Sequence, residues 1–150
     1  MLDLDGKSRE ILRILQQDGR ISNVELAARV ALSPSACLRR VQELERSGVV
    51  SGYRAVVNRQ KTGNGFTAYV TVGLSDHSKK SQQRFEHAMA AASEVRECHN
   101  IAGAYEYLLR VEVADLVSYK AFHTDILGTV PNVNSITSYM VMGSPKDERG

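Results

Sequence analysis

Hydrophobic residues in the first third of the chain recur every three or four positions, which places them on one face of an α-helix. Helix-stop residues break the pattern, so it predicts three short helices, within residues 4–19, 22–31 and 33–48. Each has a side chain that can cap its first turn: Asp5, Ser22 and Ser33. Pro34 stands at the first position of the third helix, where its missing N–H costs nothing, and Gly19 and Gly48 stop the first and third helices.

The second and third helices are separated only by the short stretch ALS. A short helix, a tight turn and a second well-capped helix form a helix-turn-helix pattern. The β-branched segment 49–58 predicts a strand or small hairpin beside the third helix, which would make the unit winged. We therefore expect a winged helix-turn-helix domain over 4–58, with its motif at about 23–42, and a polar, glycine-bearing linker over 59–65.

The second half of the chain begins with a strict alternation of hydrophobic and polar residues over 65–74, which predicts a strand with one buried face. Later patterns predict a helix, two strands, a helix and a strand, at 81–93, 94–103, 105–114, 115–130 and 133–142. The inward face of the second of these helices is expected to carry Leu116, Tyr119, His123, Ile126 and Val130. The order βαββαβ is that of a ferredoxin-like domain, here at 66–143 with a tail at 144–150. The predicted fold class is thus α+β.

The third predicted helix has two chemically different faces when its residues are placed roughly 100° apart. Its inward side is expected to carry Cys37, Leu38, Val41 and Leu44. Ser35, Arg39, Gln42 and Arg46 lie opposite, with Arg40 on the flank. Arginine, glutamine and hydroxyl groups recognise phosphates and base edges in the DNA major groove, where the second helix of a helix-turn-helix lies. We therefore predict that double-stranded DNA is a partner, contacted by Ser33, Ser35, Arg39, Arg40, Gln42 and Arg46.

Two alternatives exist for this helix face. Glu43 and Glu45 are interleaved with the arginines, so the charges could form surface ion pairs worth ~0–1 kcal/mol on a solvated helix. Three-helix winged units also serve as protein-contact modules. The charge distribution favours DNA, because residues 1–61 hold 11 Lys and Arg against 7 Asp and Glu, whereas the remainder holds 8 against 10. A basic first half suggests that this part alone meets a polyanion.

Other features of the sequence restrict the classes of function. Apolar runs fall short of the ~18 residues of a membrane span, and the first residues lack the apolar core of a signal peptide. We therefore expect a cytoplasmic protein without a membrane partner. Cys37 and Cys98 are not at metal-ligand spacing, and Cys98 and His99 are expected on opposite faces of a strand. We predict no catalytic set, no metal site and no cofactor.

Two long stretches resemble a known family. Residues 4–55, which contain RISNVELA and LSPSACLRRV, resemble the N-terminal domain of the Lrp/AsnC (leucine-responsive/asparagine regulator, feast/famine) transcription factors. Residues 97–142, which end in TSYMVM, resemble that family's effector domain. The resemblance implies a non-enzymatic regulator that forms dimers and octamers of four dimers, with an amino acid or related molecule bound between effector domains of neighbouring dimers. It carries effector-binding roles to Asn100, Gly103, Ala104, Tyr105, Glu106, Tyr139 and Met140.

The sequence departs from the family pattern near Ser8, where a second aspartate is usual, and at two further places. Ala31 stands where the turn usually has glycine, and alanine is strained if this position needs a positive φ. The effector loop usually reads Gly-Asp-Tyr/Phe-Asp, but Ala104 here lacks the first carboxylate and Glu106 is one methylene longer than the second. A carboxylate there could hold a ligand's ammonium group. The hypotheses are thus a DNA-binding regulator tuned by a small molecule, an effector-independent architectural DNA-binding protein and, third, a small-molecule enzyme.

Overall fold

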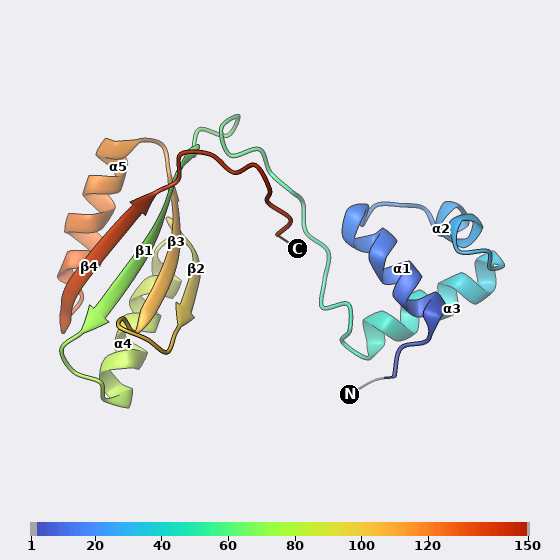
Figure 1. Cartoon of the computed structure of the whole chain (residues 1–150), viewed down its shortest axis with the longest axis horizontal. Helices are drawn as coiled ribbons and strands as arrows, with labels where there is room; N and C mark the ends of the chain where they lie inside the picture. Colours follow the sequence, from blue (N-terminus) through green and yellow to red (C-terminus); the bar gives the residue numbers. More distant parts are fainter. Residues whose placement is uncertain (1–2, 150) are drawn as a thin grey trace. The chain divides into compact units, whose positions relative to one another are not determined.

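The computed structural model describes residues 3–149, and the chain folds into two compact units (Figure 1). Of the described residues, 3–56 and 148–149 belong to the first unit and 57–147 to the second. Each unit buries its own hydrophobic core, which is the physical mark of a separate domain.

Three helices form the first unit: α1 (Gly6–Gln17), α2 (Asn23–Arg29) and α3 (Pro34–Arg46). The predicted caps are confirmed, because a backbone N–H three residues further on donates to each of the side chains of Asp5, Ser22 and Ser33. The core between the helices consists of Ile11, Ile14, Leu26, Ala27, Val30, Cys37 and Leu44. Leu38 was predicted to face inward but is 45% exposed, because it lies about 100° past Cys37, at the edge of the apolar stripe.

The turn between α2 and α3 places Ala31 in the left-handed region, at φ 53°. Leu32 N then donates to Ala27 O at 3.0 Å, which closes the end of α2. A side chain with a Cβ costs roughly 1–2 kcal/mol in this conformation. The sequence-based concern about alanine at this position is therefore confirmed, and the first unit holds a locally strained residue beside its third helix.

The strand or small hairpin predicted over 49–58 does not form, since no residue of this fully described segment is in a strand. The segment is fixed to the helices in another way. Val50 N donates to Leu44 O at 2.9 Å, and Tyr53 Oη donates to Glu45 Oε1 at 2.8 Å. A strand needs a neighbouring strand for its backbone hydrogen bonds, and the first unit offers only helices. The β-branched residues therefore belong to no sheet.

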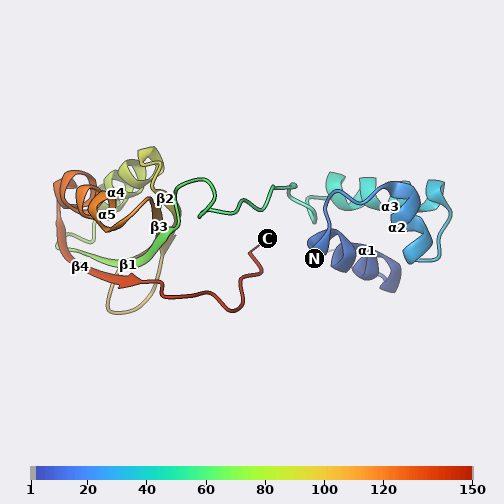
Figure 2. The same ribbon diagram turned by 90° about the horizontal axis from the view of Figure 1, so that it is seen from above.

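The second unit is a four-stranded antiparallel sheet with helices on one face (Figure 2). Its strands are β1 (Phe66–Leu74), β2 (Val95–Asn100), β3 (Tyr107–Val113) and β4 (Val133–Met140), in the spatial order β2-β3-β1-β4. Its helices are α4 (Lys79–Ala91) and α5 (Leu116–Ala121), and α5 continues as a π turn (Phe122–Ile126) and a 3-10 turn (Leu127–Thr129). This is the predicted ferredoxin-like arrangement.

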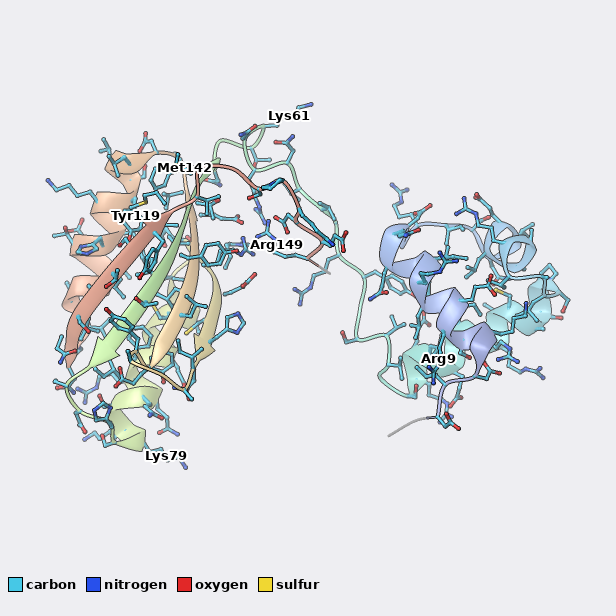
Figure 3. The ribbon with its side chains drawn as sticks, in the orientation of Figure 1. Arg9, Lys61, Lys79, Tyr119, Met142 and Arg149 are labelled. Carbon is cyan, nitrogen blue, oxygen red and sulfur yellow. The ribbon has the colours of Figure 1, made fainter. Side chains whose placement is uncertain are left out.

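One face of the sheet forms the core with the helices. Ala68, Val70 and Val72 alternate along β1 and are fully buried, as the alternation predicted. Tyr119 of α5 (Figure 3) hydrogen-bonds Ser138 of β4 and packs its ring near Phe66. The opposite face, which carries half-buried Thr67, Tyr69 and Thr71 of β1, has no helix among the described residues.

The inward face of the last helical segment differs from the prediction. Leu116 is 60% exposed and His123 is only partly buried, whereas Phe122 and Leu127 are almost completely buried. The π turn widens the helix by one residue and rotates the residues that follow it. A constant spacing of 3.6 residues therefore selects His123 in place of Phe122 and omits Leu127, although Tyr119, Ile126 and Val130 face inward as predicted.

Candidate functional site

The outer face of α3 presents polar side chains to solvent. Ser35, Arg39 and Gln42 are exposed, and the cap at Ser33 and Pro34 fixes where the helix begins. Among residues 3–149, no hydrogen bond or ion pair engages the Arg39 guanidinium, and Gln42 is likewise without one. Both side chains keep their donors available for an external partner.

Arg40, the neighbour of Arg39, is engaged within the fold. Its Nη1 atom lies 2.6 Å from Asp5 Oδ2 and 3.3 Å from Ser8 Oγ. The hydrogen bond from Arg40, together with the bond from Ser8, lowers the pKa of Asp5 to about 2. Arg40 therefore joins α3 to the start of α1, and its predicted DNA contact would compete with this pair.

Arg46 and Ser33 also have partners in the first unit. Arg46 forms a forked ion pair with Glu43, with a shortest distance of 2.6 Å, but its side chain is 77% exposed. Such exposed pairs are weak and break readily. The Ser33 hydroxyl accepts from Ala36 N and lies 3.3 Å from Ser35 Oγ, so its main role is to cap the helix.

One contact that the sequence did not suggest fixes the angle between the two helices of the motif. Asn23 Nδ2 donates to Pro34 O at 2.8 Å. This bond ties the first turn of α2 to the first turn of α3. Nothing in the local pattern marks Asn23, because its partner depends on how the turn at Ala31 folds.

The loop between β2 and β3 holds most of the predicted effector-binding residues. Asn100 Nδ2 and Ile101 N both donate to Glu106 O, at 3.1 and 2.8 Å. Glu106 N donates to Val72 O at 3.1 Å, and Tyr105 Oη lies 3.1 Å from Thr137 Oγ1. The loop is thus held against β1 and β4, with Gly103 and Ala104 exposed at its tip.

The Glu106 carboxylate is the main charged group of this region. Its Oε2 atom accepts from Leu74 N at 2.9 Å, and its Oε1 atom lies 2.8 Å from His77 Nδ1. Its side chain is 19% exposed, so one edge of the carboxylate remains accessible. A Cβ at Gly73 would lie 2.2 Å from Ser135 Oγ, so a larger residue here would force the Ser135 side chain to move. The sequence did not single out His77 or Gly73, which lie outside the loop motif.

Tyr139 and Met140 lie away from this loop within the chain. Val72 and Ile136 pair at the loop end of the sheet, and Met140 pairs with Ala68, four residues further along the strand. At about 3.3 Å per residue, this places Met140 roughly 13 Å from the loop end. Successive strand residues face opposite sides, so Met140 shares the helix-covered face of Ala68 and Tyr139 the open face of Tyr69. The predicted effector set is therefore divided into two groups.

The remaining candidate chemistry is limited. Among the described residues, no group of three or more His, Cys, Asp and Glu side chains could hold a metal ion. Cys37 and Cys98 are free thiols, and partial burial together with the Glu86 carboxylate raises the pKa of Cys98 to about 11. No helix of the described chain is long and apolar enough to cross a membrane.

Comparisons with known proteins match a different family model to each of the two units. Residues 4–51 match a family described as winged helix-turn-helix DNA-binding, and residues 67–150 match the Lrp/AsnC ligand binding domain. The leucine-responsive regulatory protein of Escherichia coli (strain K12) is 40% identical over 144 residues, which is 96% of this chain and 88% of that protein.

Two solved structures extend the comparison. A transcriptional regulator from Neisseria meningitidis, solved as an L-Met complex, has a TM-score of 0.93 at 34% identity and covers 97% of this chain and 94% of its own. An AsnC family transcriptional regulator from Agrobacterium tumefaciens has a TM-score of 0.90 at 32% identity, with coverage of 96% and 94%. The relatives named here are transcriptional regulators, not enzymes.

Proposed function

The chain belongs to the Lrp/AsnC family of DNA-binding transcriptional regulators, and we propose that it recognises specific DNA sequences and responds to an amino acid or a related small molecule. The observation that carries the DNA-binding part is the outer face of α3. Arg39 and Gln42 have free donors there, beside the exposed Ser35 hydroxyl. These groups suit guanine, adenine and phosphate respectively.

We assign the six predicted DNA contacts unequal roles. Arg39, Gln42 and Ser35 contact base edges or phosphates. Arg46 joins them when it leaves its exposed pair with Glu43. Ser33 and Arg40 act mainly by fixing the start of α3 and its attachment to α1. A dimer would place two such helices in successive major grooves, about one turn of DNA apart.

The open face of the sheet supports the assembly that we propose. It carries Tyr69 and Tyr139, paired across β1 and β4, and the half-buried Leu108 of β3. Aromatic and apolar side chains gathered on an uncovered sheet face indicate an interaction surface, which we assign to a second copy. Units of ~60 and ~85 residues are also marginally stable alone. We therefore propose a homodimer that assembles into a higher oligomer, with an octamer as the expected form.

The division of the effector set supports a site between copies. Within one chain, the loop that carries Glu106 and the residues Tyr139 and Met140 lie at opposite ends of the sheet. Two copies that meet end to end would bring one group of each kind together. We propose that Glu106 there replaces the carboxylate that the family usually has at position 104, and that it binds the ammonium group of an amino acid. The L-Met complex of the Neisseria relative supports this class of ligand.

A specific observation keeps the architectural alternative in view. Both oxygens of the Glu106 carboxylate already have partners, Leu74 N and His77 Nδ1. With Ala104 at the loop tip, an amino acid would have to displace the imidazole. If it cannot, the protein binds and bridges DNA without an effector.

Two measurements test the proposal. Fluorescence anisotropy with duplexes selected from random sequence should show binding that weakens steeply with salt, by roughly 10³–10⁵ between 50 and 200 mM for six to ten phosphate contacts. Failure to enrich any sequence would contradict sequence-specific recognition. Thermal unfolding with each of the twenty amino acids should show stabilisation of ~2.7 kcal/mol at 100 times the dissociation constant for one or a few of them. If protein that binds DNA shows no change in its thermal unfolding with any amino acid, the result would favour the architectural alternative.

A further inference from the structure

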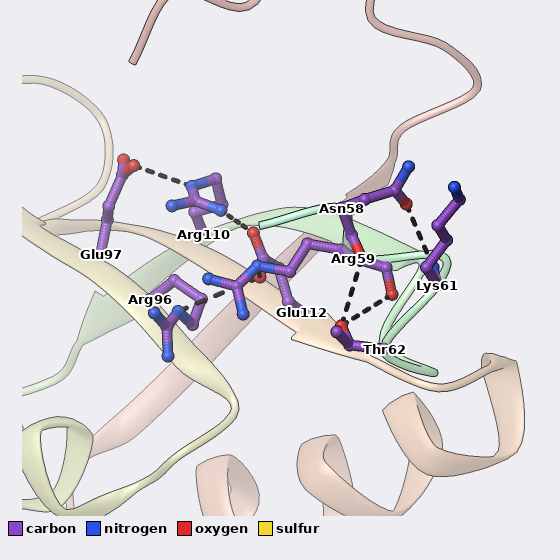
Figure 4. Close-up of polar contacts among 8 residues, drawn as sticks. All are labelled: Asn58, Arg59, Lys61, Thr62, Arg96, Glu97, Arg110 and Glu112. Carbon is purple, nitrogen blue, oxygen red and sulfur yellow. Dashed lines mark hydrogen bonds and ion pairs between the residues drawn. The ribbon is translucent and has the colours of Figure 1, made fainter. Parts of the chain in front are cut away.

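The segment predicted as a linker at 59–65 is largely a compact turn (Figure 4). Lys61 N donates to Asn58 Oδ1 at 3.1 Å, and Asn64 N donates to Arg59 O at 2.8 Å. The Thr62 hydroxyl adds a bond to Arg59 O at 3.2 Å. The preceding residues, 51–57, are exposed and contain no helix or strand. The turn is therefore the last fixed point of the second unit before the chain leads to the DNA-binding unit.

Arg59 fastens this turn to the sheet. Its Nε atom lies 2.9 Å from Glu112 Oε2, and the Glu112 side chain is only 3% exposed (Figure 4). Glu112 lies on β3, opposite Thr67 of β1 and therefore on the face that no helix covers. A buried carboxylate attracts a partner cation more strongly than an exposed one, because water screens the pair less. The contact thus fixes Arg59 more firmly than an exposed ion pair would.

The other partners of Glu112 make the network robust. Arg110 hydrogen-bonds the second Glu112 oxygen and lies 2.8 Å from Glu97 Oε1, and Arg96 lies 4.0 Å from Glu112. Burial alone would raise the pKa of Glu97, but the hydrogen bonds from Arg110 and His99 lower it. Two guanidinium groups therefore stay beside Glu112 when Arg59 is replaced. The sheet should keep its fold while the turn loses its anchor.

We propose that Arg59 is a positioning residue for DNA binding: by pairing with Glu112 it sets where the chain to the DNA-binding unit leaves the sheet. This inference rests on the proposed function. In a dimer, the reach of the exposed segment 54–57, which follows the contact of Tyr53 with Glu45, determines the effective concentration of the second recognition helix at its half-site. A fixed starting point raises that concentration, whereas a released turn lowers it. β3 also begins directly after Glu106, so the strand that carries the anchor starts at the effector loop.

The test compares duplexes that carry two half-sites or one, with full-length protein and fluorescence anisotropy. Arg59→Gln should weaken binding to the two-site duplex by about fivefold or more and change binding to the one-site duplex by less than about twofold. Arg59→Lys should recover most of the loss, because an ammonium group can still pair with Glu112. The matched control is Lys61→Gln, which removes a positive charge from the same turn without removing a side-chain ion pair seen in the structure.

A second variant separates positioning from direct contact with DNA. Glu112→Gln keeps the Arg59 charge but weakens the anchor, so it should reproduce the selective two-site loss. Equal losses on both duplexes for Arg59→Gln, with none for Glu112→Gln, would show that Arg59 contacts phosphate and would overturn the inference. Unchanged two-site binding of Arg59→Gln would overturn it as well. Absence of binding by the unaltered protein to either duplex would instead overturn the proposed function on which the inference rests.

Discussion

The two candidate sites of this protein are built in opposite ways. On α3, Ser35, Arg39 and Gln42 come from one continuous helix, so the spacing of a single element sets their geometry. The effector-binding residues come from a loop and from the far end of β4, and Glu106 and Tyr139 do not meet within one chain. A site on one helix can act alone, whereas a divided site needs a second copy. On our proposal, the first unit of a single chain can contact DNA, whereas effector binding requires the assembly of several chains.

The largest expected effect lies in the divided site. Glu106→Gln removes the charge that would bind an ammonium group, while its side-chain oxygen can still accept from Leu74 N. Amino acid stabilisation of ~2.7 kcal/mol, expected at 100 times the dissociation constant, should fall close to zero in a thermal unfolding series. Glu86→Gln, a matched change on α4, should keep the full shift because Glu86 accepts a hydrogen bond from Tyr107 on the helix-covered face of the sheet. An undiminished shift in Glu106→Gln would remove Glu106 from the site.

The next effect concerns the helix that is expected to act alone. Arg39→Ala should lower DNA affinity by ~1–3 kcal/mol, because its free guanidinium makes a base or phosphate contact. The unfolding midpoint should not change, since the side chain has no partner in the described structure. Arg46→Ala is the comparison on the same face and should cost less, because DNA must first displace Glu43. A smaller loss of DNA affinity for Arg39→Ala than for Arg46→Ala would contradict the assignment of Arg39 as the stronger contact.

Arg40→Ala should show the opposite behaviour from its neighbour. The first unit should unfold at a lower temperature, because the link between α3 and Asp5 is lost. Asp5 has its pKa lowered to about 2, so the link stabilises the unit above about pH 4 and is lost as the pH falls through 2. The difference in unfolding temperature between the variant and the unaltered protein should therefore shrink as the pH is lowered from 5 to 2. A constant difference across that range would contradict this role.

The smallest expected effect tests the strained turn. Ala31→Gly should stabilise the first unit by up to about 1 kcal/mol, because glycine adopts the left-handed φ of 53° without a Cβ clash. Glycine's greater freedom in the unfolded chain offsets part of the gain. Chemical denaturation followed by circular dichroism would measure the change. DNA affinity should stay the same, and a loss of affinity would show that the strain contributes to the angle of α3.

Local patterns in the sequence predicted what depends on neighbouring residues. The caps at Asp5, Ser22 and Ser33 were correct because each is a hydrogen bond between residues three positions apart. The alternation of β1 was correct because successive side chains of a strand face opposite sides. The strain at Ala31 was also predictable, because it depends only on the backbone conformation of that one residue in the turn.

Contacts between distant residues were not predictable in this way. Arg40 pairs with a residue 35 positions earlier, and His77 meets Glu106 only after β1 and β3 have paired. The predicted wing is absent because a strand-forming sequence does not by itself supply a partner strand. The predicted inward face of the last helical segment is wrong in part because a π turn changes the helical spacing from Phe122 onward. Resemblance named Tyr139 and Glu106 as parts of one site, but only the register shows that they lie several residues apart along the sheet of one chain.

The most direct test of a shared effector site is a mixing measurement. Glu106→Gln and Tyr139→Ala should each abolish the amino acid shift when alone, provided that Tyr139 contacts the ligand. When the two variants are unfolded, mixed and refolded together, about a quarter of the sites should join an intact Glu106 with an intact Tyr139, since a site drawn from two copies pairs them at random. We predict that ligand binding by calorimetry returns at about that stoichiometry. No recovered binding in mixed oligomers, from variants that assemble normally, would contradict a site shared between copies.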